Sequence, residues 1–438
     1  MKLKVSVIGL GFVGLTLTAF LGSKKIKVTG IDSDENKIKL IQEGKPPFFE
    51  PNLKSFLKKA IKSGCSFETK ITNETALCDF IFVTVGTPIN KNGKIDLKFI
   101  KSVTNSLEKN LGKVNSKPTI VIKSTVVPET TINVIKPILE RNSLVESIDF
   151  DLLTNPEFLK EGSAIYDTIK PHAIVIGGSI KKSIKKLVDF YKKIYPKTIP
   201  YIETNNSTAE MIKYANNSFL ATKISFINSL ANICQKIDGV NVDHVARVMG
   251  MDPRISEQFL KAGPGYGGSC FPKDLQALIF YSNQIGYNPT LLNAVRTTNN
   301  NQVKTVLNII KHNIPRLNGL KIGILGLSFK ENTDDIRESV SINLIKQLLK
   351  QKCKIFVHDP IALKNTSKVF KNKISYCENF KEILPKTECI VILTPWEIYE
   401  SINESELLKM KNSLVIDTRR ILHINNKKIK YIGLGIGN

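Results

Sequence analysis

Short apolar runs rich in Val and Ile recur along the first 200 residues, and stretches with helical spacing of apolar residues separate most of them. The runs lie at 4–10, 27–32, 80–86, 118–125, 150–156 and 172–178. Runs of this length with few polar residues are typical of strands that are buried on both faces of a parallel sheet. The alternation predicts βαβ units with right-handed crossovers, so we expect residues 1–200 to form one doubly wound domain.

The pattern changes in the middle of the chain. Residues 207–237 contain neither proline nor glycine, and their apolar residues recur every three or four positions. This spacing predicts one long helix, and Ser207 with Glu210 is predicted to form a capping box at its start. Further helix is expected over 241–250 and 272–310. We expect residues 201–310 to form a central helical region that carries a catalytic loop and a surface for dimerisation.

A second α/β domain is predicted for residues 311–438. It opens with an apolar run and a glycine turn at 320–330. A helix and three strands are expected to follow, at 338–351, 353–359, 389–394 and 414–420. The predicted fold class is therefore α/β, with two Rossmann-like doubly wound parallel-sheet domains joined by a long central helix and a helical dimerisation region.

The charge of the chain is strongly basic but evenly distributed. Its 438 residues include 63 basic and 39 acidic side chains, for a formal net charge of +24. A nucleic-acid-binding protein more often gathers basic charge on one face, together with aromatic or Arg side chains that read the bases. We therefore expect a solvated surface that attracts anionic cofactors and substrates, and no nucleic-acid partner.

Neither a membrane segment nor a metal site is predicted. No stretch reaches the roughly 20 apolar residues of a membrane helix. The apolar run at the N-terminus is broken by Gly9, Gly11 and Gly14 and lacks a small-residue cleavage site, which argues against a signal peptide. The seven cysteines are scattered and form no CxxC pair, which is neither a disulfide framework nor a zinc site. We expect a cytoplasmic protein with no membrane partner.

A dinucleotide-binding motif follows the first predicted strand. Gly9, Gly11 and Gly14 have the GxGxxG spacing and open a predicted helix, so they are expected to hold a pyrophosphate at the helix N-terminus. Asp32 ends the second strand close to the roughly 20-residue spacing at which a carboxylate binds the ribose hydroxyls and favours NAD over NADP. Lys37 is expected on the adenosine ribose side.

The glycine turn of the second α/β domain differs from the first. Residues 323–329 lack the GxGxxG spacing, and no Asp lies about 20 residues after Gly323, since Asp359 is more distant. We predict no second dinucleotide there, and a nucleotide of another kind stays open.

The chemistry is concentrated around Cys270. A glycine-rich loop at 263–268 precedes it, and Pro272 suits the first turn of a helix. A helix N-terminus and the nearby Lys273 would both lower the pKa of the thiol. Oxidising an alcohol to an aldehyde needs no nucleophile, so an activated Cys beside NAD suggests a second oxidation. The aldehyde would be captured as a thiohemiacetal, oxidised to a thioester and hydrolysed to an acid.

Two polar residues on the long predicted helix suit the same site. Lys213 and Asn217 are four positions apart, so they share one face, where they could stabilise a developing alkoxide. Spacing alone favours an ordinary polar stripe on a helix over such a site.

Eight motifs, in order along nearly the whole chain, resemble the UDP-glucose/GDP-mannose dehydrogenase family. They are GLGFVG (9–14), VTVGTP (83–88), KST (123–125), NPEFLKEG (155–162), AEMIKYANNSFLA (209–221), GPGYGGSCFPKD (263–274), GLSFKENTDDIRES (326–339) and IDTRR (416–420). The resemblance implies an NAD domain, a central helical dimer spine and a C-terminal domain for a nucleotide sugar.

The resemblance also implies a catalytic role for six residues. Cys270 matches the nucleophile of the family. Its polar partners, which handle the alkoxide, the oxyanion and a water, match Lys213, Asn217 and Asp274. Thr125 and Glu157 match residues that position or activate the hydrolytic water.

Cofactor and substrate residues are implied in the same way. Those for NAD are Gly9, Gly11, Val13, Gly14, Asp32, Lys37, Thr87, Thr125, Glu161, Lys273 and Arg337. Those for the nucleotide sugar are Glu157, Phe158, Leu159, Lys160, Glu161, Lys213, Asn217, Arg254, Phe259, Leu260, Lys261, Ala262, Gly263, Gly267, Lys330 and Arg419. Residues 259–263 with Gly267 resemble the wall around the sugar and the uridine, and Arg254 resembles a cation offered by the neighbouring subunit.

The sequence CFPKD after Gly-Gly-Ser, at 270–274, resembles the UDP-glucose branch of the family. We therefore expect oxidation of UDP-glucose to UDP-glucuronate, with UDP-N-acetylglucosamine, UDP-N-acetylmannosamine or GDP-mannose as the alternative substrates. A two-domain hydroxyacid dehydrogenase would not need Cys270. A silent NAD-binding scaffold would have lost some of Lys213, Asn217, Cys270 and Asp274, and all four are present.

Overall fold

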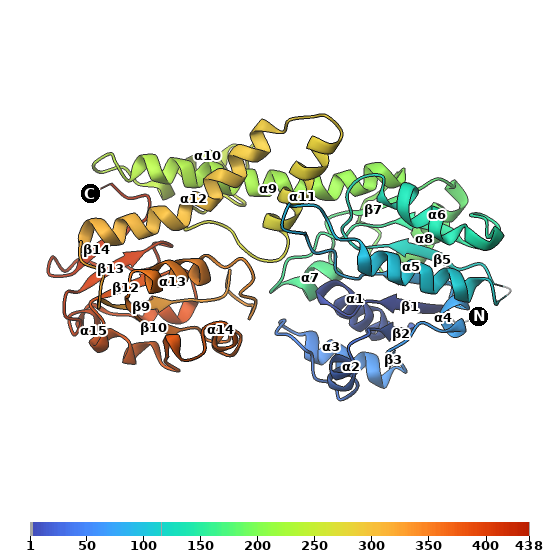
Figure 1. The fold of residues 1–438 in the computed structure, drawn as a ribbon, viewed down its shortest axis with the longest axis horizontal. Coiled ribbons are helices and arrows are strands. Elements are labelled where there is room, and N and C mark those ends of the chain that lie inside the picture. Colours follow the sequence, from blue (N-terminus) through green and yellow to red (C-terminus); the bar gives the residue numbers. More distant parts are fainter. Residues whose placement is uncertain (1–2, 115, 438) are drawn as a thin grey trace. The chain divides into compact units, whose positions relative to one another are not determined.

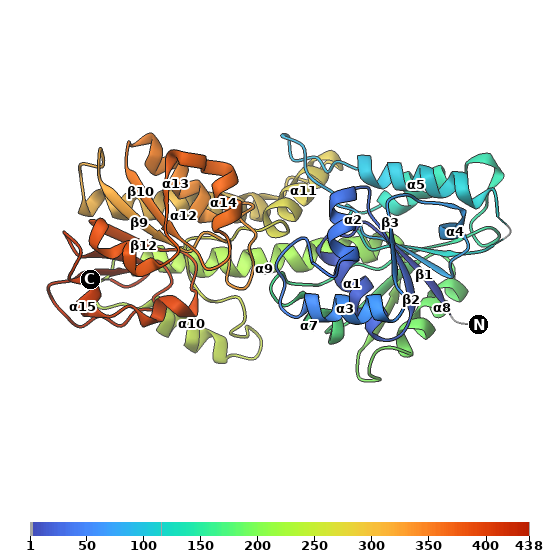
Figure 2. The same cartoon turned by 90° about the horizontal axis from the view of Figure 1, so that it is seen from below.

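A computed structural model describes residues 3–114 and 116–437 of the chain. The chain forms two compact units, which divide between Asn216 and Asn217. Figures 1 and 2 show a parallel-type sheet with flanking helices within each unit. The predicted division into 1–200, 201–310 and 311–438 stays a prediction.

The first unit is built on an eight-stranded sheet with the order β3-β2-β1-β4-β5-β6-β7-β8. Its strands are β1 (Lys4–Ile8), β2 (Lys27–Ile31), β3 (Ser66–Glu68), β4 (Phe80–Val83), β5 (Thr119–Ile122), β6 (Asp151–Thr154), β7 (Ile174–Gly178) and β8 (Tyr201–Thr204). All neighbouring strands run parallel except β6 and β7, which pair antiparallel through Leu153 and Gly178. The doubly wound sheet is confirmed, with this one reversal.

Helices cover both faces of this sheet. Successive strand residues point to opposite faces, and apolar side chains on both faces pack against helices. Val5 and Val7 of β1 belong to one buried cluster, whereas Ile8 belongs to the other. The first cluster includes residues of α1 (Phe12–Ser23), α3 (Leu53–Lys62) and α8 (Lys181–Lys192). The second includes residues of α5 (Lys98–Leu111) and α6 (Lys136–Leu139). Shorter helices are α2 (Glu35–Gln42), α4 (Asn73–Ala76) and α7 (Ala164–Ile169).

The second unit holds a six-stranded parallel sheet with the order β11-β10-β9-β12-β13-β14. Its strands are β9 (Lys321–Leu325), β10 (Lys354–His358), β11 (Ser375–Tyr376), β12 (Cys389–Ile392), β13 (Leu414–Asp417) and β14 (Lys430–Gly433). The helices are α10 (Val242–Met251), α11 (Phe271–Gln284), α12 (Thr290–Asn313), α13 (Val340–Lys350), α14 (Leu363–Phe370) and α15 (Glu404–Leu407). Residues of α12 and α13 pack into one buried cluster with this sheet.

The long helix α9 spans Asn206–Cys234, as its apolar spacing predicts. The predicted capping box of Ser207 and Glu210 is wrong. Asn205 lies before the first turn, and its Oδ1 accepts a hydrogen bond from the backbone N–H of Thr208 at 2.8 Å. Glu210 instead turns into the protein, where its Oε1 accepts from the backbone N–H and the hydroxyl of Thr131 at 2.9 and 2.6 Å.

The burial of Glu210 predicts a pH-dependent stability. Burial raises the pKa of Glu210 to about 7, and the bonds from Thr131 offset only part of this effect. Between the ordinary pKa of 4.5 and the raised one, the folded protein holds one more proton than the unfolded chain. The free energy of unfolding therefore falls by about 1.4 kcal/mol per pH unit in this window. Stability from this group is complete below pH 4.5 and is lost as the pH rises to 7.

Denaturant unfolding of the Glu210→Gln variant measures this contribution. The variant should gain about 3 kcal/mol relative to the wild type between pH 4.5 and pH 7, since its amide does not titrate. Glu203→Gln, at an exposed position on the nearby β8, should follow the wild type. Parallel pH profiles for Glu210→Gln and the wild type would contradict the assignment.

Among the helices described for residues 3–114 and 116–437, none is long and apolar enough to cross a membrane.

Candidate active site

The glycine turn between β1 and α1 requires glycine for three different reasons. Gly9 has φ +96°, and a Cβ there would lie 2.8 Å from the backbone of Val85. A Cβ at Gly14 would lie 1.9 Å from the carbonyl oxygen of Gly9, so the third glycine allows close packing of helix and strand. At Gly11, no described heavy atom would come within 4 Å of a Cβ. This open space before the N-terminus of α1 fits a pyrophosphate.

Asp32 lies beside this turn, as its spacing predicts. Its carboxylate accepts from the backbone N–H of Leu10 at 2.8 Å and of Asp34 at 3.1 Å. The ammonium of Lys37 lies 2.7 Å from the same carboxylate. Nearby, the hydroxyl of Thr87 donates to the carbonyl of Thr125 at 2.7 Å, which joins the loops that follow β4 and β5. The residues present therefore fit a nucleotide at the carboxyl end of this sheet.

The turn after β9 is built differently. Asp359 follows β10, as Asp32 follows β2, but it is almost fully buried. Its carboxylate accepts from the backbone N–H groups of Leu327, Ile361 and Ala362, and also from the indole N–H of Trp396. Asp359 therefore braces the turn and has no capacity left for ribose hydroxyls, which is a physical reason to place no dinucleotide there.

A buried ion pair lies in the first unit at the start of α9. The Nζ of Lys213 lies 2.9 Å from Oε1 of Glu157, and both side chains are at most 7% exposed. The other carboxylate oxygen of Glu157 accepts from the backbone N–H of Leu159 at 2.5 Å. The ring of Phe158 lies 5.6 Å from the ammonium of Lys213. Because a buried charge is costly without a partner, this geometry fixes both groups.

A second lysine, which the sequence analysis did not assign to the site, lies near this pair. The ammonium of Lys123 donates to Oδ1 of Asn155 at 3.0 Å, and Tyr191 donates to the same oxygen at 2.6 Å. Burial lowers the pKa of Lys123 to about 8. The negative charge of Glu157 raises this pKa, and the positive charge of Lys213 lowers it further. A pKa perturbed by burial and by specific charges is typical of a functional site.

Carboxylates from outside the loop at 157–161 accept hydrogen bonds from the backbone in and next to it. Glu50, which is buried, accepts from the backbone N–H groups of Gly162 and Ala164 at 2.8 Å each. Asp167 accepts from the backbone N–H of Lys160 at 2.9 Å. Glu50 is more than one hundred residues away in sequence, so no local pattern could have predicted this contact.

Cys270 is the N-cap residue of α11, and Pro272 lies in the first helical turn. It is part-exposed, whereas the other six cysteines are buried. Burial raises the pKa of the Cys65, Cys78 and Cys377 thiols, which makes them poor nucleophiles. The predicted helix N-terminus at Cys270 is therefore present.

Asp274 contacts two polar side chains near the start of α11. Its carboxylate accepts from the amide of Asn217 at 2.7 Å and contacts the ammonium of Lys273. Asp274 itself is 1% exposed. Asn217 follows Lys213 by one helical turn on α9. This helix therefore carries Lys213, which pairs with Glu157 in the first unit, and Asn217, which pairs with Asp274 in the second unit.

The predicted substrate wall before Cys270 is well packed. Leu260, Ala262 and Gly263 are buried, and the backbone N–H of Gly263 donates to Oδ1 of Asn228 at 2.8 Å. A Cβ added at Gly263 would lie 2.5 Å from a guanidinium nitrogen of Arg419. The Nε of Arg419 donates to the carbonyl of Leu393 at 2.8 Å, and burial lowers its pKa to about 10. A part-buried cation against glycine backbone suits an anionic ligand.

The remaining predicted residues differ in exposure. Arg254 is 87% exposed and pairs with Asp252 through a nitrogen–oxygen distance of 2.6 Å. Arg337 is 58% exposed and pairs with Asp335 in the same way. Gly267 has no room for a Cβ, which would lie 2.4 Å from the carbonyl oxygen of Glu338.

The first unit therefore has the features of a dinucleotide-binding domain, and the second unit adds a Cys at a helix start. The comparisons with family models cover most of the chain. Residues 3–195, 207–301 and 323–424 match the NAD binding domain, the central domain and the UDP binding domain of the UDP-glucose/GDP-mannose dehydrogenase family. The chain belongs to this family of NAD-dependent nucleotide-sugar dehydrogenases, which confirms the resemblance and the cofactor NAD.

Individual relatives agree with this assignment. The chain is 39% identical to UDP-glucose 6-dehydrogenase YwqF of Bacillus subtilis, over 90% of this chain and 88% of the relative. It is 36% identical to UDP-glucose 6-dehydrogenase AglM of Haloferax volcanii, over 96% and 97%. A solved UDP-glucose dehydrogenase from Pyrobaculum islandicum matches with a TM-score of 0.92 and 31% identity, over 100% and 98% of the two chains. The UDP-N-acetyl-mannosamine dehydrogenase Cap5O of Staphylococcus aureus shares the fold, with a TM-score of 0.81 and 24% identity.

Proposed function

We propose that the protein oxidises the C6 hydroxyl of UDP-glucose to a carboxylate, using two molecules of NAD and a covalent intermediate on Cys270. The observation that carries this proposal is the position of Cys270: a part-exposed thiol at the N-cap of α11, next to the Asn217–Asp274 pair. The curated relatives named UDP-glucose 6-dehydrogenase support the choice of sugar.

The first oxidation turns the alcohol into an aldehyde and releases a hydride and a proton. NAD, when bound, accepts a hydride in each oxidation. We assign the developing alkoxide to Lys213 and Asn217, which lie one turn apart on α9. The buried contact with Glu157 holds the ammonium of Lys213 in one position, so little reorganisation is needed as negative charge develops.

The second oxidation requires the nucleophile. The Cys270 thiolate attacks the aldehyde carbon, and the new C–S bond gives a thiohemiacetal. Loss of a hydride from that carbon, with the hydroxyl proton, gives a thioester. Water then breaks the C–S bond, which releases the carboxylate and the thiol. We assign the water to Asp274, Glu157 and Thr125.

The nucleotide half of the substrate is assigned to the second unit. The wall at 259–263 and the guanidinium of Arg419 present backbone polar groups and a cation together. Such a site suits the diphosphate and the uridine, because a guanidinium binds phosphate oxygens in pairs.

A comparison of four substrates tests the choice of sugar. UDP-glucose, UDP-N-acetylglucosamine, UDP-N-acetylmannosamine and GDP-mannose are each supplied with NAD, and kcat/KM is measured from NADH absorbance. We expect UDP-glucose to exceed the other three by at least about 100-fold, since an unaccommodated acetamido group or base costs several kcal/mol. A larger kcat/KM for any other sugar would replace UDP-glucose in the proposal.

We also propose a homodimer formed through α9. Phe219, Phe226 and Ile233 follow each other at seven-residue intervals and are 65%, 52% and 54% exposed. This spacing places them along one side of the helix, and such an exposed apolar stripe is typical of an interface. The exposed Arg254 would suit a residue offered to the neighbouring subunit.

Sedimentation velocity of the Phe226→Asp variant tests the dimer. A carboxylate in the middle of the stripe should weaken dimerisation by about 100-fold or more. Phe99→Asp is the matched control, because Phe99 is 46% exposed on α5 and lies outside the stripe. A monomeric wild type, or a Phe226→Asp variant that stays dimeric, would rule out this surface.

A further inference from the structure

We propose that Arg420 is a positioning residue, which holds the substrate wall at Ala262–Gly263 next to Arg419 and so sets the affinity for the nucleotide half of the substrate. The inference rests on the proposed function, since it assigns a nucleoside diphosphate to this wall. Arg420 is outside the set of substrate residues that the resemblance implies.

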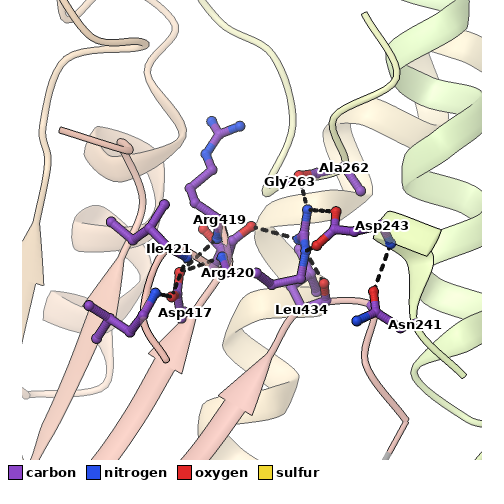
Figure 3. Close-up of polar contacts among 12 residues, drawn as sticks. Asn241, Asp243, Ala262, Gly263, Asp417, Arg419, Arg420, Ile421 and Leu434 are labelled. Carbon is purple, nitrogen blue, oxygen red and sulfur yellow. Dashed lines mark hydrogen bonds and ion pairs between the residues drawn. The ribbon is translucent and has the colours of Figure 1, made fainter. Parts of the chain in front are cut away.

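The side chain of Arg420 is fully used by contacts within the second unit. Its guanidinium forms a two-pronged ion pair with Asp243 of α10, with nitrogen–oxygen distances of 2.6 and 2.8 Å. It also donates to the carbonyls of Ala262 at 3.0 Å, Leu434 at 2.8 Å and Thr418 at 3.3 Å. The side chain is 5% exposed. One buried cation therefore joins α10, the substrate wall and the segment after β14 (Figure 3).

The turn after β13 fixes where the two arginines point. Asp417, at the end of β13, accepts from the backbone N–H groups of Arg419 and Arg420 at 2.9 and 2.7 Å, and from Ile421 at 2.8 Å. Arg420 has φ +55°, which is the left-handed region and is rare for a side chain of this size. In Figure 3 the two side chains leave this turn in different directions.

Arg420 and Arg419 lie beside two consecutive residues of the wall, Ala262 and Gly263. Arg420 donates to the carbonyl of Ala262, while the guanidinium of Arg419 occupies the space that a Cβ on Gly263 would need. The backbone N–H of Gly263 is held in turn by Asn228 of α9. Arg420 thus fixes the spacing between the wall and the turn that carries Arg419, without itself being available to a ligand.

The requirement for arginine is geometric. A lysine at position 420 keeps the positive charge beside Asp243, but its ammonium cannot bond Asp243, Ala262 and Leu434 in the same fork. A methionine would also leave Asp243 without its ion-pair partner and the two carbonyls without a donor. Lysine should therefore loosen the wall while preserving the fold, and methionine should do more damage.

The experiment compares Arg420→Lys and Asp243→Asn with the wild type and with Arg247→Lys. Arg247 is exposed on the same helix as Asp243 and serves as the matched control. Binding of UDP is measured by calorimetry, and the KM values of UDP-glucose and of NAD are measured together with kcat. Melting temperatures establish that each variant is folded. If Arg420→Lys does not fold, the Asp243→Asn variant tests the same contact from its other partner.

We expect Arg420→Lys to raise the Kd of UDP and the KM of UDP-glucose by about 10-fold, as for a lost bidentate contact, with the KM of NAD within about 2-fold. Asp243→Asn should move the same two constants in the same direction, and Arg247→Lys should move neither. Folded variants with an unchanged Kd of UDP would overturn the inference. An equal rise in the KM of UDP-glucose and in the KM of NAD would also overturn it, because that result indicates a merely structural role.

The two proposals fail in different ways. A wild type that turns over another nucleotide sugar removes UDP-glucose from the proposed function, and the Arg420 variants are then measured with that nucleotide. A wild type that binds no nucleoside diphosphate removes the proposed function itself, and with it the wall as a ligand site. A wild type that turns over UDP-glucose while Arg420→Lys binds UDP normally removes only the role of Arg420.

Discussion

Replacing Cys270 with serine should lower the rate of carboxylate formation by about 1,000-fold or more, because a serine hydroxyl at this position is not ionised near neutral pH. The thiol is part-exposed at the start of α11, and a helix dipole favours an anion at its N-terminus. A serine alcohol gains little from the same environment. The aldehyde is then not captured, and the second oxidation stops.

The variant is measured by following NADH and by identifying the sugar product by mass spectrometry. Binding of NAD and of UDP should be unchanged, since the substitution removes only the sulfur. Cys377→Ser is the matched control, because Cys377 is a buried core cysteine of the second unit, and it should keep the wild-type rate. A Cys270→Ser variant with normal output of UDP-glucuronate would exclude the covalent route.

Replacing Arg419 with methionine should raise the KM of UDP-glucose by about 100-fold, the effect of removing a charge-assisted bond to an anion. Burial already lowers the pKa of Arg419 to about 10, so the protein bears a cost to keep this cation at the wall. Its Nε is used by the carbonyl of Leu393, while the outer nitrogen Nη1 lies beside Gly263. Methionine fills a similar volume without the charge.

Steady-state kinetics with each substrate varied separately tests this prediction. The KM of NAD should stay near the wild-type value, because Arg419 belongs to the unit that matches the UDP binding domain. Arg419→Lys should fall between methionine and arginine, since it keeps the charge and loses the fork. The exposed Arg316→Met serves as the control. An unchanged KM of UDP-glucose in Arg419→Met would remove Arg419 from the substrate site.

Hydrophobic patterning predicted most reliably the strands that are largely buried. β4, β5 and β6 are buried throughout, and their apolar runs located them. β3 and β11, by contrast, have three and two residues and lie at sheet edges with exposed positions. β8 is likewise an edge strand without a buried residue. Edge strands often lack the apolar signal because short strands with exposed, polar side chains discourage pairing of the open edge with another chain.

Strand direction and helix capping were predicted less well, because distant contacts decide them. The antiparallel pairing of β7 with β6 does not follow from the apolar run of β7. Ser207 and Glu210 have the spacing of a capping box, but Thr131 of the first unit draws Glu210 inward. A local motif is a weak guide where a partner nearly eighty residues away forms the stronger contact.

For the site, sequence reasoning selected residue types but not their pairings. The motifs identified Glu157, Lys213, Asn217 and Asp274, and the structure joins them as Glu157–Lys213 and Asn217–Asp274. Sequence reasoning did not select the residues that hold the site in place. Glu50, Asn155, Asn228 and Arg420 act through hydrogen bonds to partners that are more than thirty residues away in the sequence.

The number of NADH molecules formed per molecule of UDP-glucose tests the central claim most directly. UDP-glucose is supplied in limiting amount with excess NAD, and the reaction is followed to completion by absorbance, with the sugar product quantified in the same sample. The proposed mechanism predicts two NADH and one UDP-glucuronate for each UDP-glucose consumed. One NADH for each sugar, with an aldehyde as the final product, would contradict the four-electron oxidation and the role of Cys270.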